Sequence, residues 1–311
     1  MAMRFIDARQ VAQACDYPGL VAHLRAAHRQ PPAAVERILM QQRSGAGADD
    51  AVLVWPAWQP GQHLGVKVVT MFPGNRTVPA VQGVYLLFGG NDGSPQAVID
   101  GTELTYWKTA ADSALGADLL ARPDARKLLM VGAGALAPHL IRAYQAIRPR
   151  LRQVRVWNRS ADKARAVAGA VNGTPAAMAS DLEAAVRQAD IVCCATGSHA
   201  PLVHGDWLRP GTHLDLIGGF TPAMREADDA AVRRARIFVD SRWFTVDHVG
   251  DLTQPIASGA ITRDAVRGDL FDLCGGRVAG RTTDDEITLF KSGGGAHLDL
   301  MTAQYIARAV G

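Results

Sequence analysis

The feature that most constrains this chain is an apolar strand that runs directly into a glycine-rich turn. Residues 128–137 read Leu-Leu-Met-Val-Gly-Ala-Gly-Ala-Leu-Ala. Glycines in such a turn let the backbone approach a diphosphate, and the helix that follows offers free N–H groups and the positive end of its dipole. The segment therefore predicts a dinucleotide-binding strand-turn-helix unit with contacts from Gly132, Ala133, Gly134, Ala135 and Leu136. A glycine-rich turn without a ligand is the alternative, and the order strand, glycines, helix argues against it.

The end of the next expected strand, residues 154–157, indicates which dinucleotide is bound. It runs into Asn158, Arg159 and Ser160, which begin 26 residues after Gly132. A site for NAD usually carries an acidic residue here to bind the ribose 2′-hydroxyl, whereas a 2′-phosphate needs a cation and polar donors. The sequence therefore favours NADP(H), with NAD(H) as the alternative. The Ser160 hydroxyl could instead only cap the helix that begins at Ala161.

Short apolar runs and Ala-rich segments with helical periodicity alternate through the second half of the chain. The runs lie at 127–131, 154–157, 191–195, 214–217 and 237–239. Fully apolar strands that alternate with helices predict a parallel sheet covered on both faces, so we expect a doubly wound Rossmann-type α/β domain. Ligands bind at the carboxyl ends of such strands. Thr196, Gly197, Ser198 and Ile217 follow or end two of the strands, and we expect them to contact the cofactor.

The first third of the chain has a different pattern. Residues 11–28 have the periodicity of an amphipathic helix, and a second short helix is expected through Leu39. Runs at 51–55, 64–71, 81–88 and 96–99, with a glycine-rich turn at 89–93, then predict an antiparallel sheet. We therefore expect a second α+β domain from residues 1–112, joined by the amphipathic segment 298–311, beside a Rossmann domain from residues 113–297.

Composition excludes several classes of protein. The 311 residues are 48% hydrophobic and 20% charged, and the 33 basic and 30 acidic side chains are interspersed, which does not suggest a nucleic-acid partner. Only five of the basic residues are lysine. The four cysteines lack the spacing of a metal site or a disulfide framework, and no apolar run suggests a signal peptide or a membrane span. We expect a cytoplasmic protein without a bound metal or a membrane partner.

Motifs along nearly the whole chain resemble the ornithine cyclodeaminase and mu-crystallin family. They are Gly65–Val69, Phe72–Asn75, Lys108–Ala111, Gly250–Leu252 and Phe290–Ser292, in that order. The family includes ornithine cyclodeaminases, alanine dehydrogenase-like enzymes, cyclic imino acid reductases, and mu-crystallin, a ketimine reductase that also binds thyroid hormone. The resemblance implies a homodimer built through the sheet of the first domain. It also implies that this domain binds the substrate and that the Rossmann domain binds NAD(P).

The resemblance also implies a set of substrate contacts. In the family a lysine of a GVK motif and two arginines hold the substrate carboxylate, and these positions correspond to Lys67, Arg43 and Lys108. A lysine at position 108 keeps the positive charge but lacks the two-pronged geometry of arginine. Lys108 could therefore bind the substrate carboxylate, a cofactor phosphate, or neither, and the neighbouring Thr109 is also expected to contact the cofactor. A solvent-facing strand lysine is the alternative for Lys67. Lys291 and Ser292 are expected to close the cofactor cleft.

One departure from the family pattern bears on the reaction. Cyclodeaminases of the family carry a catalytic aspartate after the strand that corresponds to 214–217, and this chain has Phe220 there. Phenylalanine cannot transfer a proton, although it could form an apolar wall for a small ring. Asp215 could in principle act in place of the missing aspartate.

We therefore expect an NADPH-dependent oxidoreductase of proline metabolism. It would reduce Δ1-pyrroline-2-carboxylate or Δ1-piperideine-2-carboxylate, both small anionic imino acids, to proline or pipecolate. Lys67 would hold the carboxylate and is the candidate proton donor, with a bound water as the alternative. Two other functions stay open. One is an NAD-dependent ornithine cyclodeaminase, and the other is a mu-crystallin-like protein that binds NADPH and a small ligand.

Overall fold

The chain divides into two compact units. The computed structural model describes residues 3–43 and 49–310. The first unit spans Met1–Lys108 and Gly295–Gly311, and the second spans Thr109–Gly294. The boundaries drawn from the sequence, after residue 112 and before residue 298, lie a few residues further along the chain. Helix α3 (Gly101–Leu120) crosses from one unit into the other.

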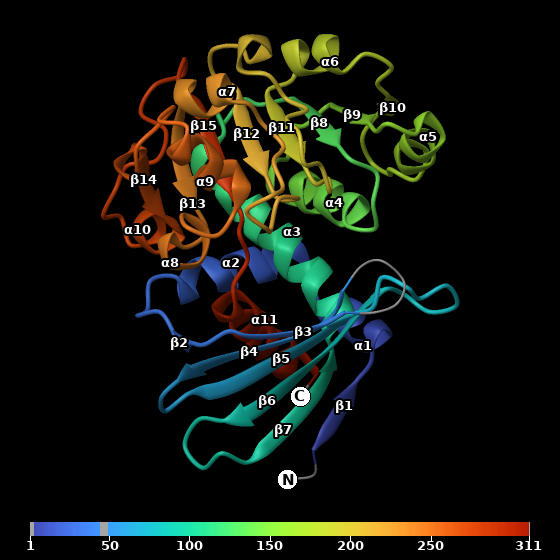
Figure 1. Cartoon of the computed structure of the whole chain (residues 1–311), viewed down its shortest axis with the longest axis vertical. Coiled ribbons are helices and arrows are strands. Elements are labelled where there is room, and N and C mark those ends of the chain that lie inside the picture. The colour runs from blue at the N-terminus through green and yellow to red at the C-terminus, as the bar shows by residue number, and fades with distance from the viewer. Residues whose placement is uncertain (1–2, 44–48, 311) are drawn as a thin grey trace. The chain divides into compact units, whose positions relative to one another are not determined.

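The first unit is built on a mainly antiparallel sheet of seven strands (Figure 1). Its order is β1-β7-β6-β5-β4-β2, and β3 also pairs with β4. Neighbours run antiparallel except β1 and β7. The strands are β1 (Arg4–Ile6), β2 (Ala34–Val35), β3 (Ile38–Gln42), β4 (Asp50–Gln59), β5 (His63–Met71), β6 (Val81–Gly89) and β7 (Pro95–Asp100).

The four runs predicted at 51–55, 64–71, 81–88 and 96–99 correspond to the strands β4, β5, β6 and β7. The predicted hairpin turn at 89–93 joins β6 to β7. The helix predicted through Leu39 is wrong, because residues 38–42 form β3 and pair with residues 50–54 of β4. A partner strand satisfies the backbone N–H and C=O groups of this segment, and such tertiary pairing overrides a weak local helical preference.

The helices of the first unit are α1 (Ala8–Ala14), α2 (Tyr17–Ala27), α11 (Ala296–Val310) and the start of α3. The single helix expected over 11–28 is interrupted, because Asp16 has an extended backbone and its side chain caps α2 by accepting from Gly19 N. Helix α11 returns from the far end of the chain and packs on β4, β5 and β6. The structure assigns Gly295–Gly311 to the same compact unit as Met1–Lys108.

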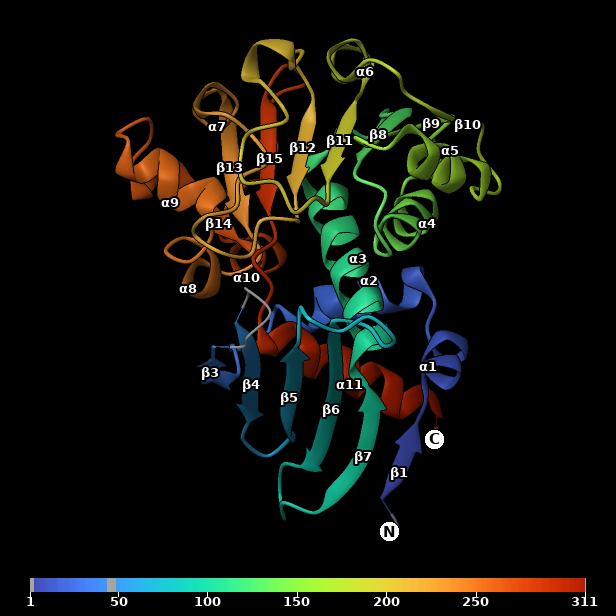
Figure 2. The ribbon, with the colours of Figure 1, turned by 45° about the vertical axis from the view of Figure 1, so that its right-hand side comes forward.

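The second unit is built on an eight-stranded sheet in which every described pair is parallel. Its order is β10-β9-β8-β11-β12-β15-β13-β14, most of which can be followed in Figure 2. The strands are β8 (Lys127–Val131), β9 (Gln153–Trp157), β10 (Ala176–Met178), β11 (Ile191–Cys194), β12 (His213–Leu216), β13 (Ala235–Val239), β14 (Val266–Asp269) and β15 (Ile287–Lys291). The five predicted strands are present, and β10, β14 and β15 were not predicted.

Helices cover both faces of the parallel sheet. They are α4 (Ala137–Ile147), α5 (Ala161–Gly169), α6 (Leu182–Gln188), α7 (Asp229–Arg234), α8 (Arg242–Thr245), α9 (Gly250–Ala257) and α10 (Leu270–Cys274), with short 3₁₀ turns η1 (Gly205–Trp207) and η2 (Arg263–Ala265). Residues of α6, α7 and α9 share a buried apolar cluster with Leu214 and Leu216 of β12. The alternate residue Asp215 contacts Ser113 of α3 and Tyr144 of α4. This is the doubly wound α/β fold that the alternating pattern predicts.

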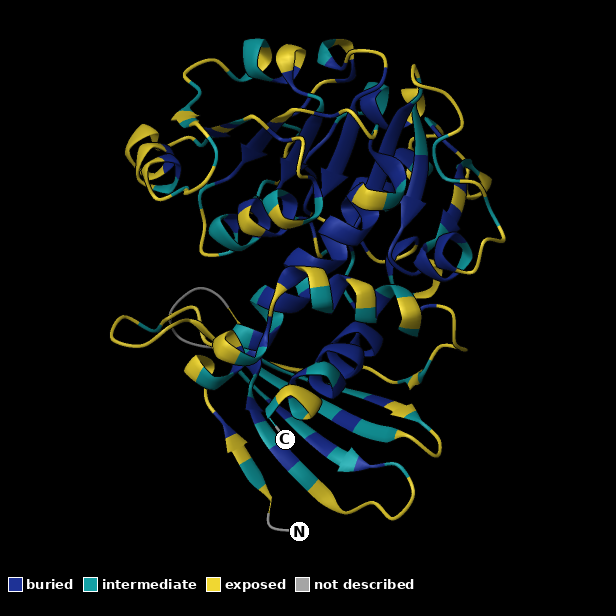
Figure 3. Ribbon diagram, turned by 180° about the vertical axis from the view of Figure 1, so that it is seen from behind, coloured by how far each residue is buried: buried dark blue, intermediate teal, exposed yellow. Residues whose placement is uncertain are grey.

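The burial of the strands differs between the parallel and the antiparallel sheet. In Figure 3 the central strands of the parallel sheet are dark blue almost throughout, whereas the long strands of the antiparallel sheet mix dark blue with teal. In the first unit, Gly65, Lys67 and Tyr85 lie on the buried face. The opposite face carries half-buried apolar side chains such as Val66 and Leu86.

Within residues 3–43 and 49–310, no helix is long and apolar enough to span a bilayer. No group of three or more His, Cys, Asp or Glu side chains there is arranged to hold a metal ion.

Asp215 is a buried carboxylate in the middle of the parallel sheet. Its Oδ2 accepts hydrogen bonds from the Tyr144 hydroxyl at 2.6 Å and from Ser113. Burial raises the pKa of Asp215 to about 6, although the hydrogen bonds from Ser113, Tyr144 and Cys193 oppose the rise. The side chain is 0% exposed, so it does not act at the surface of a pocket as the cyclodeaminase aspartate would. The charged form of this carboxylate therefore costs stability above its pKa.

We predict that Asp215→Asn stabilises the protein increasingly as the pH rises. The Asn oxygen can accept from both Ser113 and Tyr144, and the amide cannot ionise. In the wild type the cost of ionisation is absent below about pH 4, grows between pH 4 and pH 6, and is complete above pH 6, where it reaches about 3 kcal/mol. Melting temperatures of both proteins at pH 4, 6 and 8 check this. A difference that stays constant with pH would contradict it.

Candidate functional site

The glycine-rich turn after β8 is shaped by close backbone approach. Gly132 has φ +113°, and a Cβ atom there would lie 2.5 Å from the carbonyl oxygen of Ala195. Its N–H donates to the carbonyl of Trp157 at 2.8 Å. A Cβ atom on Gly134, in contrast, would meet no protein atom within 4 Å. The first glycine is thus needed for packing against β11, and the second leaves open space where a diphosphate can approach.

The helix that follows has the features expected of an anion-binding end. Pro138 lies in the first turn of α4, and no side chain caps this end of the helix by a hydrogen bond. Leu140, Ile141 and Tyr144 are buried, in agreement with the predicted apolar stripe. The Ala137 N–H already donates to the Gly134 carbonyl at 3.0 Å and Pro138 has no N–H, so an anion at this end would be stabilised mainly by the helix dipole and the open turn before the helix.

A cavity of about 800 Å³ opens along the carboxyl edge of the parallel sheet. It is large enough to take much of a dinucleotide. Its lining includes three predicted segments from three different turns: Gly132, Ala133, Gly134, Asn158, Arg159, Ser160, Thr196, Gly197 and Ser198. The structure therefore brings together residues up to 66 positions apart that the sequence assigned to one site. Lining residues that sequence reasoning missed are Trp157, Lys163, Ala195, His199, Ala200 and Leu202.

Two cations lie at the end of this cavity beside β9. Arg159 is exposed, and Ser160 caps α5 by accepting from the backbone N–H of Lys163 at 3.4 Å. Lys163 lines the same cavity. It could have been found from the sequence, because the third residue after a helix cap lies in the first turn, beside the cap. No acidic residue is among the lining residues, which matches the absence of a carboxylate noted in the sequence.

Other predicted cofactor residues lie outside this lining. Ile217 is 8% exposed, and Ser292 is buried and donates to Asp112 at 2.9 Å. Lys291 is 0% exposed, and its Nζ lies 3.0 Å from Asp251 Oδ2. The expectation that the Lys291 side chain lines a cleft is therefore corrected to a buried ion pair. Thr109, Ala135 and Leu136 are also absent from the lining.

The first unit holds a separate cluster of buried charges. Lys67 Nζ lies 3.0 Å from Asp299 Oδ1 and donates to Thr105 Oγ1 at 2.6 Å. Lys108 Nζ lies 3.9 Å from the same Asp299 oxygen. Two lysines thus share one carboxylate, which leaves a net positive charge in a buried environment. Lys67 does not face solvent as a simple surface lysine would, since it is 5% exposed.

The electrostatics of Lys67 are set mainly by burial. Burial lowers its pKa below the usual 10.5, the nearby Lys108 lowers it further, and the charge of Asp299 opposes both effects. Asp299 is therefore the group that favours the charged form of Lys67. The sequence did not single out Asp299, because an acidic residue in an amphipathic helix gives no signal of its own. Arg43, the third predicted substrate contact, follows β3 and is exposed.

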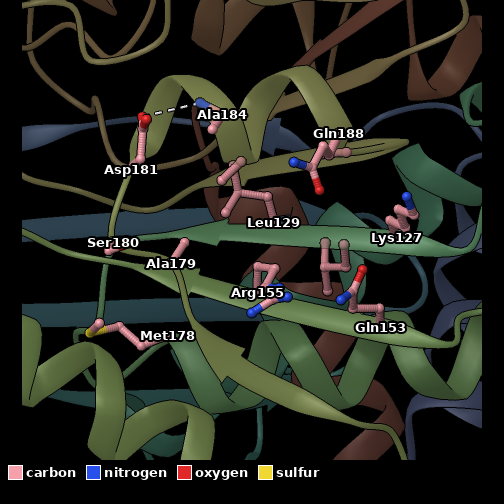
Figure 4. Close-up of a pocket in the computed structure, with 13 residues that line it drawn as sticks. Lys127, Leu129, Gln153, Arg155, Met178, Ala179, Ser180, Asp181, Ala184 and Gln188 are labelled. Carbon is pink, nitrogen blue, oxygen red and sulfur yellow. Dashed lines mark hydrogen bonds between the residues drawn. The ribbon is translucent and has the colours of Figure 1, made fainter.

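A second hollow in the second unit lies away from the glycine-rich turns. It runs beneath α6 and reaches Lys127 and Gln153, the first residues of β8 and β9 (Figure 4). Figure 4 shows Leu129 and Arg155 along the floor of this hollow. At the start of α6, the side chain of Asp181 accepts a hydrogen bond from the backbone N–H of Ala184. Its volume of about 190 Å³ is much smaller than that of the cavity at the glycine-rich turns. None of the predicted site residues lines it.

The sequence profile of the ornithine cyclodeaminase/mu-crystallin family matches residues 19–310. The chain belongs to this family. The family expected from the motifs is therefore confirmed, and the matched range covers both units.

Individual members of the ornithine cyclodeaminase/mu-crystallin family resemble the chain over most of their length. A Delta(1)-pyrroline-2-carboxylate reductase of Paracoccus denitrificans is 49% identical over 93% of this chain and 92% of that protein. The structure of Thermococcus litoralis Delta(1)-pyrroline-2-carboxylate reductase in complex with NADH and L-proline superposes with a TM-score of 0.92 at 26% identity, over 99% of this chain and 97% of the other. A probable ornithine cyclodeaminase from Bordetella pertussis gives a TM-score of 0.87 at 33% identity, over 99% and 97%.

Proposed function

We propose that this protein is a nicotinamide-dependent oxidoreductase that reduces the C=N bond of a cyclic imino acid carrying a carboxylate. The observation that carries the proposal is the glycine-lined cavity at the carboxyl edge of the parallel sheet. The substrate class is taken from the similar reductases, one of which is 49% identical to this chain. Δ1-pyrroline-2-carboxylate is the first substrate to test, and the six-membered Δ1-piperideine-2-carboxylate is the second.

The residues present fit a dinucleotide. The open space at Gly134 and the uncapped start of α4 suit the diphosphate, and the turn at Asn158–Ser160 suits the adenosine ribose. A bound nicotinamide supplies the hydride that the reduction needs. The role of the protein is to hold the dinucleotide in an extended conformation along this edge of the sheet and to keep the nicotinamide ring in a fixed orientation.

The buried lysines of the first unit suit the substrate carboxylate. Among residues 3–43 and 49–310, Lys67 and Lys108 pair with one carboxylate, that of Asp299, so one positive charge is left there for an anionic ligand. A buried, desolvated ammonium group binds a carboxylate more strongly than a solvent-exposed ammonium group does, because little water competes with the ion pair. Lys67 is also the candidate donor of the proton that the imine nitrogen takes up, since burial lowers its pKa.

Two observations weigh against ornithine cyclodeamination. Phe220 occupies the turn after β12 where family cyclodeaminases carry their aspartate, and the side chain is 64% exposed in this loop. Asp215 cannot substitute, because it is buried between β12 and the helices α3 and α4. Phe220 remains our candidate for an apolar wall beside the substrate ring.

We predict that the protein oxidises NADPH when it is mixed with Δ1-pyrroline-2-carboxylate or Δ1-piperideine-2-carboxylate. The loss of absorbance at the nicotinamide band of NADPH measures the rate. Chromatography should show proline or pipecolate in equal amount. The matched assay supplies L-ornithine and NAD and measures ammonia. Ammonia release without imine reduction would overturn the proposal in favour of a cyclodeaminase. Tight binding of NADPH without either reaction would favour a ligand-binding protein.

We further propose that NADP(H) is preferred to NAD(H). Arg159 and Lys163 offer two cations beside the place of the adenosine ribose, and the lining holds no carboxylate to bind a 2′-hydroxyl. A guanidinium and an ammonium with a nearby serine are well suited to a phosphate group. The reductase of Thermococcus litoralis, in contrast, is described in complex with NADH.

Arg159→Ala is predicted to raise the KM for NADPH at least tenfold and to change the KM for NADH less than twofold, because only NADPH carries the 2′-phosphate. Steady-state kinetics with both cofactors measure this. Arg165→Ala is the matched control, since Arg165 is an exposed arginine of α5, the helix that follows Arg159, and pairs with Asp162. Equal increases for both cofactors in Arg159→Ala would contradict the assignment.

We propose a homodimer formed through the outer face of the antiparallel sheet. Val66, Val68, Val84, Leu86 and Val98 line this face on neighbouring strands, opposite to Lys67 and Tyr85. All five are only half-buried. A contiguous apolar sheet face of this kind is typical of an interaction surface, and a second copy offers a complementary one.

Leu86→Asp is predicted to convert the dimer to a monomer, because a charge would be buried at the centre of the contact. Light scattering after gel filtration measures the molar mass. Trp243→Asp is the control, since Trp243 is an apolar residue of the second unit that is 78% exposed. A monomeric wild type, or a dimer that persists in Leu86→Asp, would argue against this interface.

The cellular location is also a proposal. The thiols of Cys15, Cys193 and Cys194 are buried, and none of these three cysteines forms a disulfide. Free thiols are typical of a reducing compartment, which supports the cytoplasm.

A further inference from the structure

Glu226 is fully buried between two turns of the carboxyl edge of the parallel sheet. Its Oε1 accepts hydrogen bonds from the backbone N–H of Thr196 at 2.7 Å and from Thr196 Oγ1 at 2.8 Å. Its Oε2 accepts from the backbone N–H of Gly218 at 2.7 Å. Thr196 follows β11 and Gly218 follows β12, so one carboxylate holds the turns of two adjacent strands. Three hydrogen bonds to a carboxylate constrain these turns strongly.

The turns are packed so closely that no side chain fits between them. A Cβ atom on Gly218 would lie 2.0 Å from the carbonyl oxygen of Thr196 and 2.6 Å from Glu226 Oε1. On the other side, Gly132 of the diphosphate turn packs against the carbonyl of Ala195. Contacts therefore run without a gap from Glu226, through Thr196 and Ala195, to the first glycine of the diphosphate turn.

A second buried carboxylate fixes Glu226 in turn. Asp251 Oδ1 accepts from the backbone N–H of Glu226 at 2.7 Å, and Asp251 Oδ2 lies 3.0 Å from Lys291 Nζ. Glu226, Asp251 and Lys291 are each 0% exposed. Burial raises the pKa of Glu226 to about 7, an effect that the charge of Lys291 opposes and that of Asp251 reinforces. The network thus joins β11, β12, β15 and the start of α9.

The place of Glu226 relative to a bound dinucleotide follows from the order of the strands and rests on the proposed function. The adenosine ribose is expected at the end of β9 and the diphosphate at the end of β8. The sheet continues from β8 to β11 and β12, so an extended dinucleotide carries its nicotinamide over the turns at Thr196 and Gly218. Glu226 lies beneath these turns and does not line the cavity.

We propose that Glu226 is a positioning residue for the nicotinamide half of the cofactor, and that it acts by holding the Thr196 and Gly218 backbones at one fixed separation. Asp251 and Lys291 hold Glu226 in this position. The adenosine half of the dinucleotide depends on other turns, at 132–134 and 158–160, that make no hydrogen bond with Glu226. The role therefore predicts that loss of the carboxylate affects the two halves of the cofactor unequally.

Glu226→Gln tests this proposal. An amide has one acceptor, so it can satisfy the donors of Thr196 or that of Gly218 but not both. We expect the Kd for NADPH, measured by fluorescence titration, to rise at least tenfold. The Kd for 2′-phospho-ADP-ribose, which lacks the nicotinamide, should change less than twofold. If Glu226→Gln does not fold, Thr196→Val serves instead, since it removes the hydroxyl that donates to Glu226 and also accepts from the Ser198 N–H. We expect it to show the same unequal effect on the two Kd values, at a smaller size.

Asp215→Asn is the matched control. Like Glu226→Gln, this substitution neutralises a fully buried carboxylate. The Asp215 carboxylate, however, lies on β12 and accepts hydrogen bonds from residues of α3 and α4, not from the edge turns. We expect Asp215→Asn to leave both Kd values within twofold of the wild type. Equal losses for NADPH and the fragment in the variant at Glu226, or no loss for either, would overturn the positioning role. A wild type that binds neither ligand would overturn the proposed function and this inference with it.

Discussion

The site of the second unit depends on the close approach of three backbone turns at the carboxyl edge of one parallel sheet. Gly132 lies against Ala195, and Gly218 lies against Thr196 and Glu226, at separations that exclude any side chain. Parallel strands place the ends of all these connections at the same edge, so close packing of the turns creates one continuous surface. A Cβ atom at Gly132 or Gly218 would push the turns apart.

Buried charge is the second constraint, and it explains the unusual use of lysine. The chain has only five lysines, and three of them, Lys67, Lys108 and Lys291, are buried. Lys67 and Lys108 share Asp299, and Lys291 pairs with Asp251. A compact ammonium on a flexible chain can reach a buried carboxylate in a small space, whereas a guanidinium needs more room and more acceptors. The same chemistry thus forms a buried ion pair in each unit, for which we propose an anion site in the first unit and a rigid support in the second.

The fold alone does not decide the reaction, because related proteins of this family carry different names. A pyrroline-2-carboxylate reductase and a probable ornithine cyclodeaminase both superpose on nearly the whole chain. We propose that a small number of side chains near the edge turns separates the reactions, and Phe220 is our first candidate in this sequence. Function therefore has to be argued from the site.

Local sequence patterns were enough to predict the fold class, the family, five strands of the parallel sheet, and the turns at Gly132–Gly134, Asn158–Ser160 and Thr196–Ser198 that line the cavity. These features are local, because glycines, apolar runs and helix caps act over a few residues. Tertiary structure alone decided that residues 38–42 form a strand and that β15 lies between β12 and β13. It also decided that Lys291 is buried and that Asp299, Glu226 and Asp251 pair with groups far away in the chain. An isolated acidic residue has the same appearance in a sequence whether it is solvated or buried. Only the packing of distant segments determines whether its charge is paired.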